Sequence, residues 1–157
     1  MKKFITLLAA AALSVSLLSA QNASHSTGDM SIVAGAGFGS LGPCLSASFD
    51  YTAFDFGQSG NLSFGGYAGD SVEDSTHCLL VGALANYRFP VSSAFELSAR
   101  GVVGYAWVFN QVAHTRGIFG KAVMAGANYY FSDRIGVGAE LGLGVAPALS
   151  AHVVIRL

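Results

Sequence analysis

From residue 29 onward, apolar residues recur at every second position, and this alternation restricts the fold more than any other feature. In the stretch 135–145, apolar residues fill the odd positions and glycine fills all but one of the even positions. A period of two is that of a β-strand with two different faces, whereas a helix repeats about every 3.6 residues. The alternation predicts eight strands, at 30–40, 44–54, 61–69, 77–89, 94–107, 119–131, 135–145 and 149–157.

Tight and long connections join the predicted strands. Residues 57–60, 90–93 and 132–133 are rich in turn formers and predict short hairpins, whereas 70–76 and 108–118 are longer and more polar. An up-and-down barrel has short turns on one rim and longer loops on the other. The sequence therefore predicts an all-β fold, a closed eight-stranded antiparallel up-and-down transmembrane β-barrel.

The first twenty residues have the three parts of a secretory signal peptide. Two lysines precede an apolar stretch, and Ser19 and Ala20 supply a small-residue cleavage site. We predict a cleaved signal peptide over 1–20 and a barrel domain over 21–157. Gly, Ser or a charge interrupts every later apolar stretch, so none has the length of a membrane-spanning helix. If the mature chain lies in a membrane, it crosses as a barrel.

The apolar face carries too many large side chains to point inward. An eight-stranded barrel has an interior only just wide enough for side chains, and the opposite face is mainly Gly, Ala and Ser. Charged residues make up 11% of the chain, against roughly 25% in soluble domains. Aromatic residues gather in two groups, one near the tight turns (Phe49, Tyr51, Tyr87, Phe89, Phe95, Tyr129, Phe131) and one near the long loops (Phe38, Tyr105, Trp107, Phe119). These groups predict two interfacial girdles around an apolar outer wall.

The chain resembles the small eight-stranded outer-membrane β-barrels of the OmpX-like and OmpA transmembrane-domain type. The aromatic-ended turns at 87–90 and 129–133 and the glycine-alternating strand 135–145 carry this resemblance. It implies a place in the outer membrane of a Gram-negative bacterium, in contact with outer-membrane lipid and lipopolysaccharide, and insertion by the barrel-assembly machinery. The family usually ends in an aromatic residue, and this chain departs from that pattern by ending in Leu157.

Seven ionisable residues point into the lumen if the apolar face meets lipid. Arg88 and Glu96 flank the turn at Pro90 and should be neighbours, and Arg100 and Glu140 should meet across the lumen. A narrow lumen holds charges only when they pair. We interpret the set as a network that fills and stiffens the barrel; a gated ion path is the alternative. The full set is Asp50, Arg88, Glu96, Arg100, Glu140, His152 and Arg156.

Residue types suited to catalysis occur near the outer rim without a family motif around them. Asp74, Ser75 and His77 at one loop and His114 at another could supply a nucleophile, a base and an acid. His25 lies in the N-terminal tail, on the opposite side of the membrane. Because no family motif surrounds these residues, we predict no catalytic residues. The histidine spacings do not match a metal site, so we also predict no metal and no cofactor.

Cys44 and Cys78 are the two cysteines of the chain, and both fall near the outer rim. They lie on predicted strands separated by one other strand, which is near the distance limit for a disulfide. An exported chain allows a disulfide, so a bridge and two buried thiols both stay open.

These features predict a non-enzymatic outer-membrane barrel with a structural or surface-interaction role. A formal net charge of -1 gives no reason to expect a nucleic-acid partner. The alternatives are a small pore or transport barrel, a soluble secreted ligand-binding barrel with the faces inverted, and a lipid A-modifying barrel enzyme. Any surface ligand would meet the loops at 70–76 or 108–118, and the residues do not name it.

Overall fold

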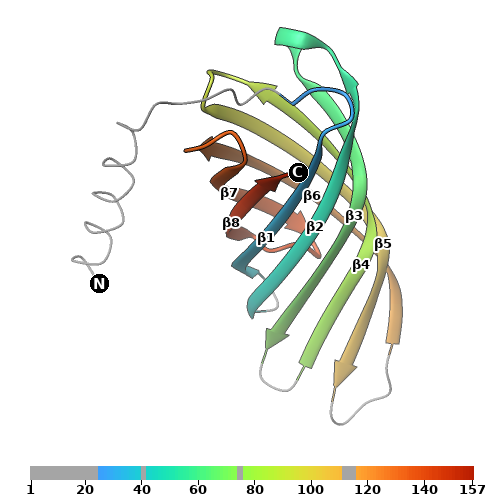
Figure 1. Ribbon diagram of the computed structural model, residues 1–157. Coiled ribbons are helices and arrows are strands. Elements are labelled where there is room, and N and C mark those ends of the chain that lie inside the picture. Colours follow the sequence, from blue (N-terminus) through green and yellow to red (C-terminus); the bar gives the residue numbers. More distant parts are fainter. Residues whose placement is uncertain (1–24, 40–41, 74–75, 111–115) are drawn as a thin grey trace, which may run out of the picture.

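Eight antiparallel strands close into one barrel in the computed structural model, which describes residues 25–39, 42–73, 76–110 and 116–157. Each strand pairs with its neighbour in chain order, and β1 pairs with β8 (Figure 1). The fold class predicted from the alternation is confirmed, while the predicted signal peptide lies outside the described residues. The strands are β1 Met30–Gly39, β2 Gly42–Asp55, β3 Asn61–Glu73, β4 Thr76–Pro90, β5 Phe95–Asn110, β6 Arg116–Tyr130, β7 Ile135–Gly144 and β8 Leu149–Arg156.

The predicted tight turns all lie on one rim. A 3-10 turn, η1 Gly57–Ser59, joins β2 to β3, and short connections follow β4 and β6. Gly57 and Gly60 have positive φ angles of 61° and 107°, the backbone region that glycine adopts most readily. Among the described residues, no helix has the length and apolar character needed to cross a membrane. We call this end the turn rim and the opposite end the loop rim.

The two faces of the sheet differ as the alternation predicts. Large apolar side chains are exposed on the outside, including Leu143 (78%), Phe119 (73%) and Leu45 (69%). The aromatic residues of both predicted girdles lie on the same face, with Phe38 and Phe49 among the most exposed. The opposite, inner face is buried. The barrel therefore has an apolar outer wall, made by the exposed large side chains, around a buried interior.

Neighbouring strands are displaced along one another around the barrel. One row of paired residues begins on β6 and passes through the other seven strands in turn. It returns to β6 ten residues away, from 127 to 117, and such a stagger tilts the strands of a closed barrel. The row runs through Ala127, Ala139, Ala151, Ala36, Leu45, Asp70, Leu79, Trp107 and Gly117.

Four strands are longer than predicted at the loop rim. The predicted loop 70–76 is largely strand, because Val72 pairs with His77 and Glu73 with Thr76. The predicted loop 108–118 also contributes to β5 and β6. Ladder hydrogen bonds join backbone groups whatever the side chains, so the polar composition used to predict loops does not end a strand. Figure 1 shows β3 to β6 reaching further at the loop rim than β1, β7 and β8.

The lumen half nearest the loop rim is filled by apolar side chains. The prediction that the inner face is mainly small and charged is wrong there, because glycines on neighbouring strands leave room for larger residues: a Cβ at Gly120 would lie 2.8 Å from Leu80 Cδ1. The β7–β8 connection also folds inward, with Val145 N donating to Lys121 O at 3.2 Å. Its Ala146 joins the apolar cluster, which comprises Tyr67, Cys78, Leu80, Leu84, Val102, Ala106, Ala122, Met124 and Ala146.

Candidate functional site

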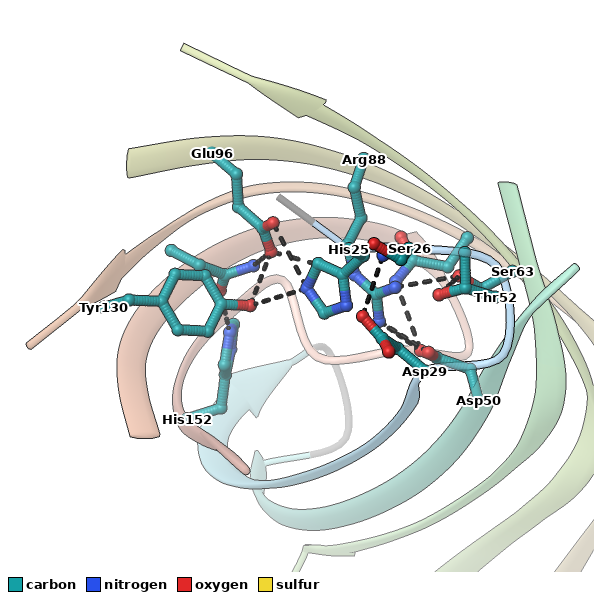
Figure 2. A network of polar contacts seen from close by, with 12 residues as sticks. His25, Ser26, Asp29, Asp50, Thr52, Ser63, Arg88, Glu96, Tyr130 and His152 are labelled. Atoms are coloured by element: carbon teal, nitrogen blue, oxygen red, sulfur yellow. Dashed lines mark hydrogen bonds and ion pairs between the residues drawn. The ribbon is translucent and has the colours of Figure 1, made fainter. Parts of the chain in front are cut away.

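All seven ionisable residues assigned to the lumen lie on the inner face, and none is more than 9% exposed. They occupy the half of the lumen nearest the turn rim, below the apolar cluster. Figure 2 shows most of them, together with several polar residues that the sequence analysis did not single out. The network has two parts, one around Arg88 and one around Glu140.

Arg88 is the centre of the first part. Its Nη2 lies 2.6 Å and 2.7 Å from the two carboxylate oxygens of Asp50, and its Nη1 donates to Ser63 Oγ at 2.8 Å. Asn86 Nδ2 also donates to Asp50, at 3.3 Å. The charges therefore have several partners, as buried charges require. The sequence did not reveal the Arg88–Asp50 pair, because β2 and β4 are separated by β3.

Glu96 receives donors from the neighbouring strand. Its Oε1 accepts hydrogen bonds from Asn128 Nδ2 and Tyr130 Oη, both at 2.8 Å, and Arg88 Nε lies 3.7 Å away. The predicted proximity of Arg88 and Glu96 is thus present, although Asp50 is the nearer carboxylate. The Arg156 guanidinium stacks 4.0 Å above the Tyr130 ring, a cation–π contact. The alternation also places Tyr130 on the inner face. It was not among the predicted lumen residues because that set was limited to charged residues and His152.

Glu140 is the centre of the second part. Arg100 Nε lies 3.1 Å from its Oε1, so these residues meet across the lumen, and His152 Nδ1 lies 3.8 Å from its Oε2. His152 Nε2 is also 2.6 Å from Asn128 Oδ1. Because Asn128 donates its amide hydrogen to Glu96 and its oxygen only accepts, His152 carries its hydrogen on Nε2. Asn128 therefore connects the two parts into one network.

His25 lies inside the barrel mouth at the turn rim, although the sequence placed it in an N-terminal tail. Its Nε2 is 3.2 Å from Tyr130 Oη and 3.5 Å from Glu96 Oε2. Figure 2 shows the imidazole between the Tyr130 phenol and the Arg88 guanidinium. Burial lowers the pKa of His25 below its ordinary value, against the opposing effect of Glu96, while Arg88 and Arg156 also disfavour its charge. His25 is therefore neutral near neutral pH.

Backbone hydrogen bonds hold the segment that carries His25. Gly28 N donates to Thr52 O at 2.9 Å, and Thr52 N donates to Asp29 O at 2.8 Å. Asp29 Oδ2 in turn accepts a hydrogen bond from Ser26 N at 2.8 Å. No sequence signal could have placed His25, because it precedes the first strand and so has no alternating neighbours to fix its direction.

Cys44 and Cys78 are free thiols, both buried on the inner face. They share a register row in which Ser71 of β3 lies between them. Adjacent strands are about 4.8 Å apart, so Cα atoms two strands apart lie beyond the roughly 7 Å limit of a disulfide. The disulfide considered from the sequence is not formed in the structure.

The residues considered for catalysis are not assembled into a site among the described residues. His77 faces outward near the loop rim, where its Nδ1 lies 3.6 Å from Asp70 Oδ2. Asp74, Ser75 and His114 lie outside the described residues. No group of three His, Cys, Asp or Glu residues suited to a metal occurs in the described part of the chain.

Comparison with known proteins gives a structural likeness only, because no protein-family model and no curated sequence matches the chain. The N-terminal β-barrel domain of Pseudomonas aeruginosa OprF superposes with a TM-score of 0.62 over 85% of this chain and 100% of that domain, at 16% sequence identity. The chain has the fold of the small eight-stranded outer-membrane β-barrels. Neisserial surface protein A (NspA) is a second match, with a TM-score of 0.47, 16% identity, and coverage of 81% of this chain and 94% of that one. At this identity the outer-membrane barrel fold is shared, and the chemistry of the lumen rests on this chain's own residues.

Proposed function

We propose that this protein is a non-enzymatic, non-conducting barrel of the Gram-negative outer membrane with a structural role in the envelope. The filled lumen is the observation that carries the proposal. His25 and the ion-pair network occupy the half nearest the turn rim, and the apolar cluster occupies the other half. A pore would need a continuous polar path, and apolar side chains interrupt it here.

The apolar outer wall supports the membrane location. Leu143, Phe119 and Leu45 are each more than two-thirds exposed, and they belong to a surface that surrounds the barrel. Soluble monomers rarely expose continuous apolar areas of that size. A soluble ligand-binding barrel would instead turn these side chains inward. We further propose that outer-membrane lipid and lipopolysaccharide surround this wall and that the barrel-assembly machinery inserts it.

The closed polar network supports a non-enzymatic role. Asp50, Arg88 and Glu96 are each at most 1% exposed, so a substrate cannot reach them without displacing the packing around them. Their charges are satisfied by one another and by neighbouring amides and hydroxyls. A general acid or base must instead come within hydrogen-bond reach of a substrate.

Fractionation and conductance together test the proposal. We expect the protein in the outer-membrane fraction, with a gel mobility that differs between unboiled and boiled samples, as a detergent-resistant barrel shows. In planar bilayers it should give no regular conductance steps. A matched variant with Leu80→Ala and Leu84→Ala should conduct more, whereas the outward Leu97→Ala should not. Recovery from the soluble periplasmic fraction, or regular steps from the unaltered protein, would overturn the proposal.

A further inference from the structure

The outer wall has a step at the loop rim, because β6 continues beyond the end of its neighbour β7 (Figure 1). The last residues that pair in this direction are Ala122 of β6 and Gly144 of β7. Gly144 has a φ of 96°, which glycine adopts readily, and a side chain there would collide with Lys121 O. The chain turns inward after this glycine. Residues 116–120 of β6 therefore pair with β5 on one side and with no described strand on the other.

Backbone donors of β6 face this step. Successive residues of an antiparallel strand direct their N–H and C=O groups to alternate sides. Val145 N donates to Lys121 O at 3.2 Å, so the odd residues of β6 face the β7 side. The N–H groups of Gly117 and Phe119 consequently point at the step, where no described residue accepts their hydrogens. The hydroxyl of Tyr105 lies beside them, since a Cβ at Gly117 would collide with it.

A cation stands on the outer wall at the same place. Lys121 is exposed and pairs in register with Val103, which is 53% exposed, so its side chain is on the outer face. The ammonium group makes no hydrogen bond or ion pair with any residue in the described part of the chain. The carboxylates of the two neighbouring strands, Glu96 and Glu140, are both buried in the lumen, so neither reaches this ammonium.

Lys121 lies at the level where lipid headgroups begin. It is nine residues from Tyr130, the turn-rim end of β6. Nine residues of a strand tilted by about 40° rise by about 23 Å, and the apolar band of a bacterial barrel is about 25 Å tall. Val123 and Leu143, on the turn-rim side of Lys121, are 63% and 78% exposed and belong to that band. The lysine therefore faces the headgroups at the loop-rim edge of the membrane.

We propose that this step binds a phosphate group of lipid A, the membrane anchor of lipopolysaccharide. The phosphate lies against the Lys121 ammonium and accepts hydrogen bonds from Phe119 N–H and Tyr105 Oη. The acyl chains lie over Val123 and Leu143. An unpaired cation with free N–H and O–H donors, above an apolar surface, complements a lipid whose headgroup is anionic and accepts hydrogen bonds. This inference rests on the proposed membrane location and goes beyond it, because a barrel can lie among such lipids without holding one at a fixed site.

Native mass spectrometry of the delipidated mature barrel in an uncharged detergent tests the proposal with three lipids. These are lipid A with both phosphates, lipid A from which both phosphates have been removed, and phosphatidylglycerol, whose phosphodiester carries one charge. We expect intact lipid A to be retained about tenfold more tightly than either of the others, as the loss of a charged hydrogen bond implies. Equal retention of lipid A without phosphates would refute the phosphate contact, and equal retention of phosphatidylglycerol would refute lipid A as the preferred lipid.

Two sets of variants locate the phosphate. Lys121→Gln should weaken the retention of intact lipid A about tenfold, and Lys121→Arg should keep it, as the loss or conservation of the charge implies. Arg134→Gln removes one positive charge at the turn rim and should leave retention unchanged. Phe119→Pro removes the N–H at an open strand edge, where proline is tolerated, and should weaken retention more than Phe119→Ala does.

Each variant is first checked for heat-modifiable mobility, so that a failed barrel is recognised as such. If Phe119→Pro fails this check, Lys121→Gln decides. Unchanged retention of intact lipid A by folded Lys121→Gln would overturn the site, although the membrane barrel would stand. Absence of the unaltered protein from the outer-membrane fraction would instead overturn the proposed function.

Discussion

Replacing Arg88 with methionine should be among the most damaging single changes in the lumen. Methionine fills much of the same volume, so the main loss is the positive charge between Asp50 and Glu96, which are 0% and 1% exposed. Asp50 would keep the donor from Asn86 at 3.3 Å, and Glu96 would keep two donors from β6. Removing one partner of a buried ion pair costs about 3–5 kcal/mol. We expect the free energy of unfolding to fall by that amount.

Urea unfolding of the barrel in phospholipid vesicles measures this loss, with the fluorescence of the single tryptophan, Trp107, as the signal. Combining Arg88→Met with Asp50→Asn should restore part of the stability, because the neutral asparagine amide replaces the carboxylate that lost its partner. His77→Gln is the matched control: it removes an exposed contact between His77 and Asp70 and should cost no more than about 1 kcal/mol. A loss of under about 1 kcal/mol for Arg88→Met would refute the reasoning, because it would mean that water reaches the carboxylates.

Three further predictions concern the outer wall, the mouth and the thiols. Val137→Arg should hinder insertion into vesicles by about 2–4 kcal/mol while Val137→Leu should not, and equal insertion yields would place this face away from lipid. Burial lowers the pKa of His25, so the unfolded state binds a proton at this residue more readily than the folded state does. Acidification from about pH 7.5 to about pH 5.5 should therefore lower the free energy of unfolding more than it does in His25→Gln. The opposite sign in urea titrations would contradict this. Cys44 and Cys78 should react with maleimide after unfolding and show no disulfide on non-reducing gels after mild oxidation.

The alternation of residue types determined the fold and the direction of most side chains without any tertiary information. Strand geometry sends successive side chains to opposite faces, so parity alone placed Arg100 and Glu140 inside and Phe119 outside. Tight turns marked by Gly, Pro, Ser or Asp predicted the topology of the turn rim. Parity also places Leu80 and Leu84 inside. The sequence does not show that they fill half of the lumen, because glycines dominate the inner face elsewhere, for example in 135–145.

Only the closed barrel decided which side chains meet. Arg88 finds Asp50 on the next strand but one, and Asn128 joins Glu96 to His152, because curvature brings together inner faces that are distant in the chain. His25 gained its place from hydrogen bonds between its segment and β2. Parity specifies a direction for each side chain, whereas register and closure specify its partner.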